Sequence, residues 1–186
     1  MMKKIFAQGL HYPEGPAFDR EGNLYVVEIQ GGQVSRLSDV GDMSVFSRTG
    51  GGPNGANFGP DGNLYVCNNG AFLAPGKRRE PGRIERIRPD GSIEVLITEI
   101  DGEPLTSPND LGFDEYGNFY FTDPVYGQKG LVDPPPGSVC FSDLKGNARR
   151  LHRGFQFPNG IGVTSNGRTL IVAESTTFTL HAFDFL

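Results

Sequence analysis

A membrane-spanning helix needs about 18 apolar residues, and no apolar run in this 186-residue sequence comes close to that length. The N-terminus also has no apolar stretch of signal-peptide length. The sequence also has no excess of basic residues, because its formal net charge is -5. This charge argues against nucleic acid or an anionic membrane as a partner. There are only two cysteines, Cys67 and Cys140, and each lies inside an apolar run, as buried thiols do. These absences favour a soluble, cytoplasmic protein with a small-molecule partner.

Turn residues, by contrast, are abundant: the sequence has 27 glycines and 14 prolines. Short apolar runs of strand length alternate with them, and no helical pattern follows the glycines, so a nucleotide-binding loop is not predicted. The histidines His11, His152 and His181 show no catalytic spacing, and neither a Ser-His-Asp order nor zinc-finger spacing occurs. The composition and pattern predict an all-β protein.

A repeated motif is the strongest pattern in the sequence. Four segments can be written in register: PEGPAFDREGNLYVVE, PNGANFGPDGNLYVCN, PNDLGFDEYGNFYFTD and PNGIGVTSNGRTLIVAE. Their second positions are Glu14, Asn54, Asn109 and Asn159. The distance from one repeat to the next is close to the length of a propeller blade, which is about 40 to 50 residues. Each repeat divides into short strands joined as a meander. The sequence therefore predicts a single partial β-propeller domain over residues 1–186, with about four blades.

The ends of this array raise a question of closure. The fourth repeat reaches only its third strand, TLHAFDFL, whereas a propeller avoids exposed sheet edges by closing into a ring. We therefore expect the chain to be incomplete, or to be completed by another chain, including self-association through open blade edges. The segment KKIFAQGL is expected to form a strand that serves as the outer strand of a final blade.

Chemistry is expected at the second position of each repeat. Propeller symmetry would place Glu14, Asn54, Asn109 and Asn159 around the same end of the central channel. Carboxylate and amide oxygens suit a hard cation such as Ca²⁺. The alternative is that Asn and Gly after proline only form turns, but four occurrences in register favour a site.

The connections between second and third strands should lie at that same end of the channel. They are long in the second and third repeats, and long loops on a rigid scaffold often carry binding function. Candidate substrate contacts in these loops are Phe72, Lys77, Arg78, Arg79 and Tyr126. The basic cluster is alternatively a solvated loop; if it binds substrate, it favours an anionic one.

Three segments, PEGPAFDREGNLYVVE, SPNDLGFDEYGNFYFTDPVYG and FPNGIGVTSNGRTLIVAES, resemble the gluconolactonase, senescence marker protein and luciferin-regenerating enzyme family. FTDPVYG is similar to the corresponding segment of its bacterial sugar lactonases. The resemblance covers essentially the whole chain. It implies a six-bladed propeller, a divalent cation in the channel, Ca²⁺ or else Zn²⁺, and hydrolysis of a sugar lactone.

The same resemblance implies roles for individual residues. Glu14 and Asn159 match the family's metal ligands, Asn109 matches a residue that contacts metal or substrate, and Asn54 is a weaker match as a substrate contact. The family's catalytic aspartate belongs to a fifth repeat, beyond Leu186, so no catalytic residue is predicted here. Some relatives have an arginine where this chain has Ser107, so their substrate contacts are not carried over.

Three functions remain open at this point: a metal-dependent lactonase, a propeller that binds a ligand without catalysis, and a fragment of a larger lactonase. Because Glu14 is the one carboxylate among the predicted ligands, the chain alone is expected to bind metal weakly and to turn over little.

Overall fold

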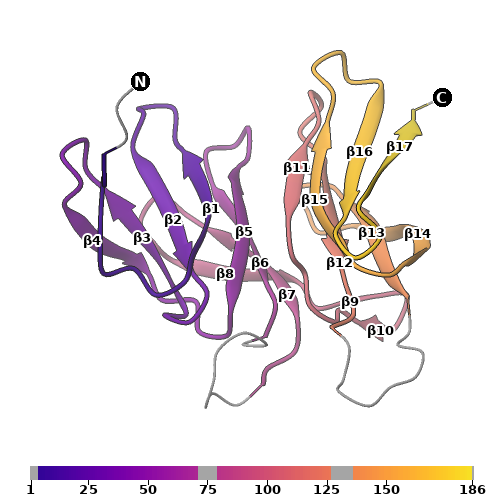
Figure 1. The fold of residues 1–186 in the computed structure, drawn as a ribbon, viewed down its shortest axis with the longest axis horizontal. Coiled ribbons are helices and arrows are strands. Elements are labelled where there is room, and N and C mark those ends of the chain that lie inside the picture. Colours follow the sequence, from indigo (N-terminus) through magenta and orange to yellow (C-terminus); the bar gives the residue numbers. More distant parts are fainter. Residues whose placement is uncertain (1–3, 71–78, 127–135, 186) are drawn as a thin grey trace.

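The computed structural model describes residues 4–70, 79–126 and 136–185, and its regular secondary structure is entirely β (Figure 1). In these described ranges, four antiparallel sheets of three or four strands follow one another, and each is a meander whose strands lie in sequence order. Figure 1 shows the first two sheets side by side and the last two beyond them. This is the predicted series of propeller blades. Among the described residues, no helix has the length and hydropathy of a membrane span.

Within the described part of the chain, the first three blades have four strands and the last has three. Blade one contains β1 (Pro13–Phe18), β2 (Leu24–Glu28), β3 (Gln33–Leu37) and β4 (Met43–Ser47). Blade two contains β5 (Pro53–Phe58), β6 (Leu64–Asn68), β7 (Arg83–Ile87) and β8 (Ile93–Ile97). Blade three contains β11 (Leu111–Phe113), β12 (Phe119–Asp123), β13 (Gly137–Ser142) and β14 (Ala148–Phe155). Blade four contains β15 (Pro158–Val163), β16 (Thr169–Glu174) and β17 (Thr179–Asp184).

A two-stranded hairpin between blades two and three was not predicted. It pairs β9 (Glu99–Ile100) with β10 (Glu103–Pro104). The two residues between them, Asp101 and Gly102, have φ of 56° and 76°. Positive φ at both positions is what a two-residue hairpin turn requires, and Asp-Gly is its common sequence.

Two strand boundaries also differ from the expectation. β11 begins at Leu111 and not at Asn109, although the Asn109 N–H still donates to the Thr122 carbonyl at 2.9 Å. The pairing is irregular at the start of the other three inner strands as well. Residues 4–10, expected as a strand, belong to no sheet, because they form no ladder of backbone hydrogen bonds with a described strand.

The hydrophobic cores lie between consecutive blades. In β6, Leu64 and Val66 pack in the core shared with blade one, whereas Tyr65 and Cys67 pack in the core shared with blade three. Successive strand residues point to opposite faces, so a strand buried on both faces reads as a continuous apolar run. Both cysteines are free and buried, as predicted, and burial raises the pKa of Cys140 to about 12.

The turn glycines of the repeats have the conformation that their spacing predicted. Their φ values are 85°, 80°, 85° and 68° for Gly22, Gly62, Gly117 and Gly167. Glycine adopts this left-handed conformation without steric cost, so it suits the turn that joins the first strand of each blade to the second.

One polar residue ends the second strand of each blade, and we call these four the strand-end acceptors: Glu28, Asn68, Asp123 and Glu174. They are at most 6% exposed. Each accepts a backbone N–H from the segment just before the inner strand of its own blade, namely from His11, Gly52, Ser107 and Gln156 respectively. Buried backbone donors need such partners, so these side chains fix where each inner strand begins.

Replacing Asp123 by alanine is expected to lower the free energy of unfolding by about 2 to 4 kcal/mol. Its carboxylate accepts the N–H groups of Thr106 and Ser107 at 3.0 and 2.7 Å, and both would lose their acceptor. Urea unfolding followed by circular dichroism measures the change. Asp39→Ala, at an exposed loop position, is the control and should have little effect.

The same carboxyl should give stability a distinct pH dependence. Burial raises the pKa of Asp123 above its ordinary value of 3.8, although the two backbone hydrogen bonds oppose the rise. A raised pKa in the folded state favours the fold below the ordinary pKa, and that contribution is lost as the pH rises through the folded pKa. Asp123→Asn cannot ionise, so its deficit relative to wild type should be smaller at neutral pH than near the ordinary pKa. A deficit that grows with pH would contradict this assignment.

Candidate functional site

A pocket of about 540 Å³ lies where the inner strands begin. It brings together the side chains that the repeats placed at equivalent positions. The predicted site residues that line it are Glu14, Asn54, Asn109, Tyr126 and Asn159. The sequence separates these residues by up to 145 positions, and the blade arrangement alone makes them neighbours. Their roles as ligands stay predictions.

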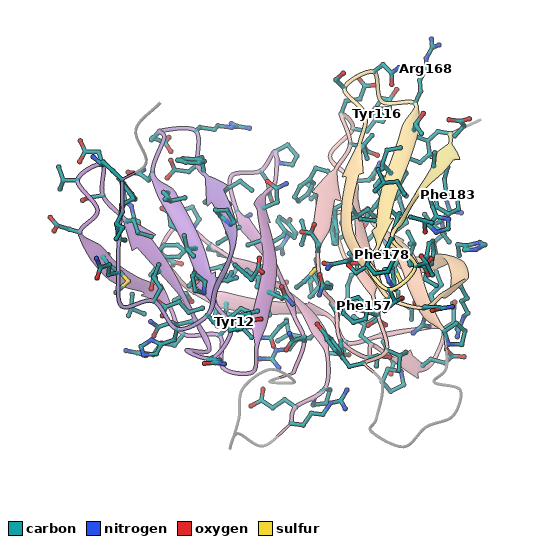
Figure 2. The ribbon with its side chains drawn as sticks, viewed as in Figure 1. Tyr12, Tyr116, Phe157, Arg168, Phe178 and Phe183 are labelled. Carbon is teal, nitrogen blue, oxygen red and sulfur yellow. The ribbon has the colours of Figure 1, made fainter. Side chains whose placement is uncertain are left out.

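The pocket lies at one end of the blades. Tyr12 and Phe157 line it and lie at the same end of the ribbon in Figure 2, whereas Tyr116 and Arg168, on strand-connecting turns, lie at the opposite end. The inner strands therefore run away from the pocket. The connections between second and third strands return to it, as predicted, because Ile29 and Tyr126 come from two of them.

The polar groups of the pocket differ in burial. Asn54 and Asn109 are 7% and 6% exposed, whereas the carboxylate-bearing Glu14 is exposed. The amide nitrogen of Asn109 donates to the Tyr126 hydroxyl at 3.2 Å, and that of Asn159 donates to the Ser175 hydroxyl at 2.9 Å. The amides are thus held by neighbours, while Glu14 is open to solvent.

In blades one and two, the inner strand approaches its neighbour so closely that only glycine fits after the polar residue. The Gly55 N–H donates to the Asn109 carbonyl at 2.6 Å, and a Cβ on Gly55 would lie 2.6 Å from that same oxygen. A Cβ on Gly15 would lie 2.7 Å from the Asn54 carbonyl. Glycine is therefore required at Gly15 and Gly55 by main-chain contact between blades, whereas a Cβ on Gly160 would meet no atom closer than 3.8 Å.

Asp110 is a second carboxylate in the pocket, and the sequence analysis missed it. It occupies the position at which the other repeats have glycine. Its Oδ1 accepts the Leu111 N–H at 2.9 Å and its Oδ2 accepts the Ile161 N–H of blade four at 3.3 Å. Burial raises the pKa of Asp110, the two backbone hydrogen bonds oppose the rise, and the charge of Glu14 adds to it. The expectation of a single carboxylate is corrected to two, of which Glu14 has the freer oxygens.

The predicted loop contacts have different outcomes. The ring of Tyr126 meets that of Phe157 edge to face, with 5.0 Å between centroids, and burial raises the pKa of its hydroxyl. Arg79 is exposed, and its guanidinium lies 3.5 Å from the Ser107 hydroxyl. Phe72, Lys77 and Arg78 lie outside the described residues.

A second cavity, of about 630 Å³, lies at the opposite end of the inner strands. Its walls combine aromatic side chains, including Phe18, Phe58 and Phe113, with charged ones, and the carboxylates of Asp19 and Asp114 accept hydrogen bonds within their own turns. Its two aspartates are therefore engaged in their own turns, whereas the first pocket contains the exposed carboxylate of Glu14. The first pocket is therefore the stronger candidate for chemistry.

The donor set of that pocket fits a hard cation. Within the described ranges, no three His, Cys, Asp or Glu side chains are grouped to hold a metal ion, so a soft-metal or all-carboxylate site is not indicated. One solvent-open carboxylate with several carboxamides is instead a set of oxygen donors, which Ca²⁺ accepts. Glu14, Asn109 and Asn159 are the residues that would hold it.

Fold and site together define a β-propeller with a polar pocket at one end of its central channel. Residues 12–186 match the profile of the SMP-30/Gluconolactonase/LRE-like region, and the chain belongs to this family. It is 30% identical over 182 residues to lactonase drp35 of Staphylococcus haemolyticus, covering 96% of this chain and 52% of the relative. It is 25% identical over 192 residues to the gluconolactonase of Zymomonas mobilis, covering 92% and 51%.

Solved structures support the fold. The gluconolactonase XC5397 of Xanthomonas campestris superposes with a TM-score of 0.79 at 24% identity, covering 95% of this chain and 59% of that chain. Regucalcin of Agrobacterium tumefaciens superposes with a TM-score of 0.72 at 15% identity, covering 100% and 60%. The chain spans about half the length of the curated relatives described above.

Proposed function

We propose that this chain contributes the cation- and substrate-binding face of a sugar lactonase. The observation that carries the proposal is the convergence of Glu14, Asn54, Asn109 and Asn159 on one pocket. The similar proteins support this proposal at the level of the family, because the two relatives described above are named lactonase and gluconolactonase. A small-molecule lactone in the cytoplasm is the proposed partner.

A divalent cation is proposed at the pocket, and Ca²⁺ suits the oxygen donors best. The Agrobacterium neighbour is named a calcium-binding protein, which agrees with this choice. When bound, such a cation polarises a lactone carbonyl and stabilises the charge that develops on its oxygen.

The chain's own residues would hold the cation and the substrate. The Glu14 carboxylate would supply charge to the cation, and the Asn109 and Asn159 oxygens would complete its coordination. Tyr126 and Asn54 would hydrogen-bond hydroxyl groups of the sugar ring. With two carboxylates, Glu14 and Asp110, in the pocket, a neutral lactone is favoured over an anionic one.

The 186-residue chain is expected to bind Ca²⁺ weakly, with a dissociation constant on the order of 10⁻⁴ to 10⁻³ M, because one carboxylate is free to serve it. Isothermal titration calorimetry measures this affinity. Tight, submicromolar binding would contradict the donor set described here.

Hydrolysis of glucono-1,5-lactone, followed by pH-stat against the spontaneous rate, tests the reaction. We expect slow turnover that EDTA abolishes and added Ca²⁺ restores. Turnover indifferent to EDTA would overturn the cation-dependent reaction. Lactone binding without turnover and without a cation would instead support the alternative of a non-catalytic binding propeller.

A further inference from the structure

The carboxamides of Asn109 and Asn159 each have two chemically different ends. A cation binds the oxygen Oδ1 and is repelled by the Nδ2 amide hydrogens, so the side chain is useful only in one of its two orientations. Which orientation is adopted follows from the hydrogen-bond partners of the amide. The partners of these two side chains therefore matter to the site.

In both residues the nitrogen end has a hydroxyl acceptor. The Nδ2 of Asn109 donates to the Tyr126 hydroxyl at 3.2 Å, and the Nδ2 of Asn159 donates to the Ser175 hydroxyl at 2.9 Å. In the described part of the chain, no protein hydrogen bond is formed to the Oδ1 of either residue. Since both side chains line the pocket, each oxygen is left for a ligand there.

The residues that carry the two hydroxyls are anchored, Tyr126 by its ring and Ser175 by its backbone. The ring of Tyr126 packs edge to face on Phe157, and its hydroxyl also hydrogen-bonds the Asn54 side chain. The Ser175 N–H donates to the Phe157 carbonyl at 3.0 Å, and Ser175 follows the strand-end acceptor Glu174. Both acceptors are thus tied to the segment that leads into β15, and neither depends on a bound ligand for its position.

We infer that Tyr126 and Ser175 are positioning residues, which accept the Nδ2 hydrogens of Asn109 and Asn159 and so direct the two Oδ1 atoms into the pocket. The inference rests on the proposed function for its consequence, because a cation is what would use those oxygens. It gives Ser175 a role in the site that its repeat position did not predict. It also gives Tyr126 a task that precedes substrate binding.

Side-chain amide NMR of the cation-free protein tests the orientation directly. The Nδ2 hydrogens of Asn109 should lose their hydrogen-bonded shift and exchange faster with water in Tyr126→Phe, and those of Asn159 should do so in Ser175→Ala. Ser175→Thr keeps the hydroxyl and should retain the wild-type signal of Asn159. Tyr116→Phe and Ser165→Ala, at exposed turn positions, are matched controls. Circular dichroism with urea unfolding confirms that each variant is folded.

Titration with Ca²⁺ alone and with Tb³⁺ alone tests the consequence. Each of Tyr126→Phe and Ser175→Ala should weaken binding by about tenfold, as loss of a residue that orients a metal ligand does. A residue that touches only substrate would raise KM for the lactone and leave cation affinity unchanged.

The outcomes separate this inference from the proposed function. Wild-type protein that binds neither ion would end the cation proposal, while the amide signals would still decide whether the hydroxyls orient the amides. Amide signals unaltered in both variants would overturn the inference. Altered signals with unaltered affinity, in a protein that binds the ion, would overturn it as well.

Discussion

Replacement of Glu14 by glutamine is expected to weaken Ca²⁺ binding by about 100-fold, and lactone hydrolysis should fall with it. Glutamine keeps the length of the side chain and one oxygen but removes the charge. Glu14 is exposed in the pocket, whereas the oxygens of the other carboxylate, Asp110, accept backbone hydrogen bonds. Loss of Glu14 therefore leaves the cation without an unshared negative ligand. Calorimetry and Tb³⁺ luminescence measure the loss.

Glu21→Gln is the matched control, because Glu21 is an exposed acid on the turn at the far end of the same strand pair. It changes the net charge by the same amount and should leave the affinity within about twofold, since long-range effects of exposed charges are screened by salt. Equal losses in the two variants would show that general charge, and not coordination, attracts the ion.

Replacement of Gly55 by alanine is expected to lower the free energy of unfolding by about 3 kcal/mol. The added methyl would lie 2.6 Å from the Asn109 carbonyl oxygen and 2.6 Å from atoms of Asp110, so blades two and three must separate. Because Asn54 and Asn109 flank this contact, cation affinity should fall together with stability. Urea unfolding and Ca²⁺ titration measure the two effects.

Gly162→Ala provides the comparison. Gly162 also lies in an inner strand, β15, and an added Cβ there would meet no atom within 4 Å. Its effect on stability should be within about 0.5 kcal/mol. A comparable loss in both variants would mean that alanine disfavours the inner strands in general, and that close contact at Gly55 is not the cause.

The propeller could be predicted because its repeats are regular in sequence. Four copies of proline, a polar residue and a turn glycine at constant spacing fix the blade count, and symmetry then brings Glu14 and the three asparagines together. Strand length and turn chemistry are local properties, so the strands and the positive φ at the turn glycines could be anticipated. The hairpin at Asp101–Gly102 could also have been predicted, because Asp-Gly is a common sequence of two-residue hairpin turns.

The parts that escaped prediction depend on contacts between segments that are separated in the sequence. Asp110 was visible as the one departure from glycine in the motif, but its bond to Ile161 of the next blade is not a property of either segment alone. The strand-end acceptors likewise ended all four aligned segments as Glu, Asn, Asp and Glu. Their common role is to accept a hydrogen bond, which several residue types can do, so residue identity concealed it. Ser175 follows the last of them, and nothing local distinguishes it.

The direct bond between the Gly55 N–H and the Asn109 carbonyl has a broader consequence. Between blades two and three, it makes the width of the pocket opening a main-chain distance, set by peptide groups in contact and not by the side chains that line the pocket there. Substitutions of the side chains that line the pocket can then change its chemistry without changing the width of this opening. A scaffold of this kind can diversify its chemistry one residue at a time while the size of what it admits stays constant.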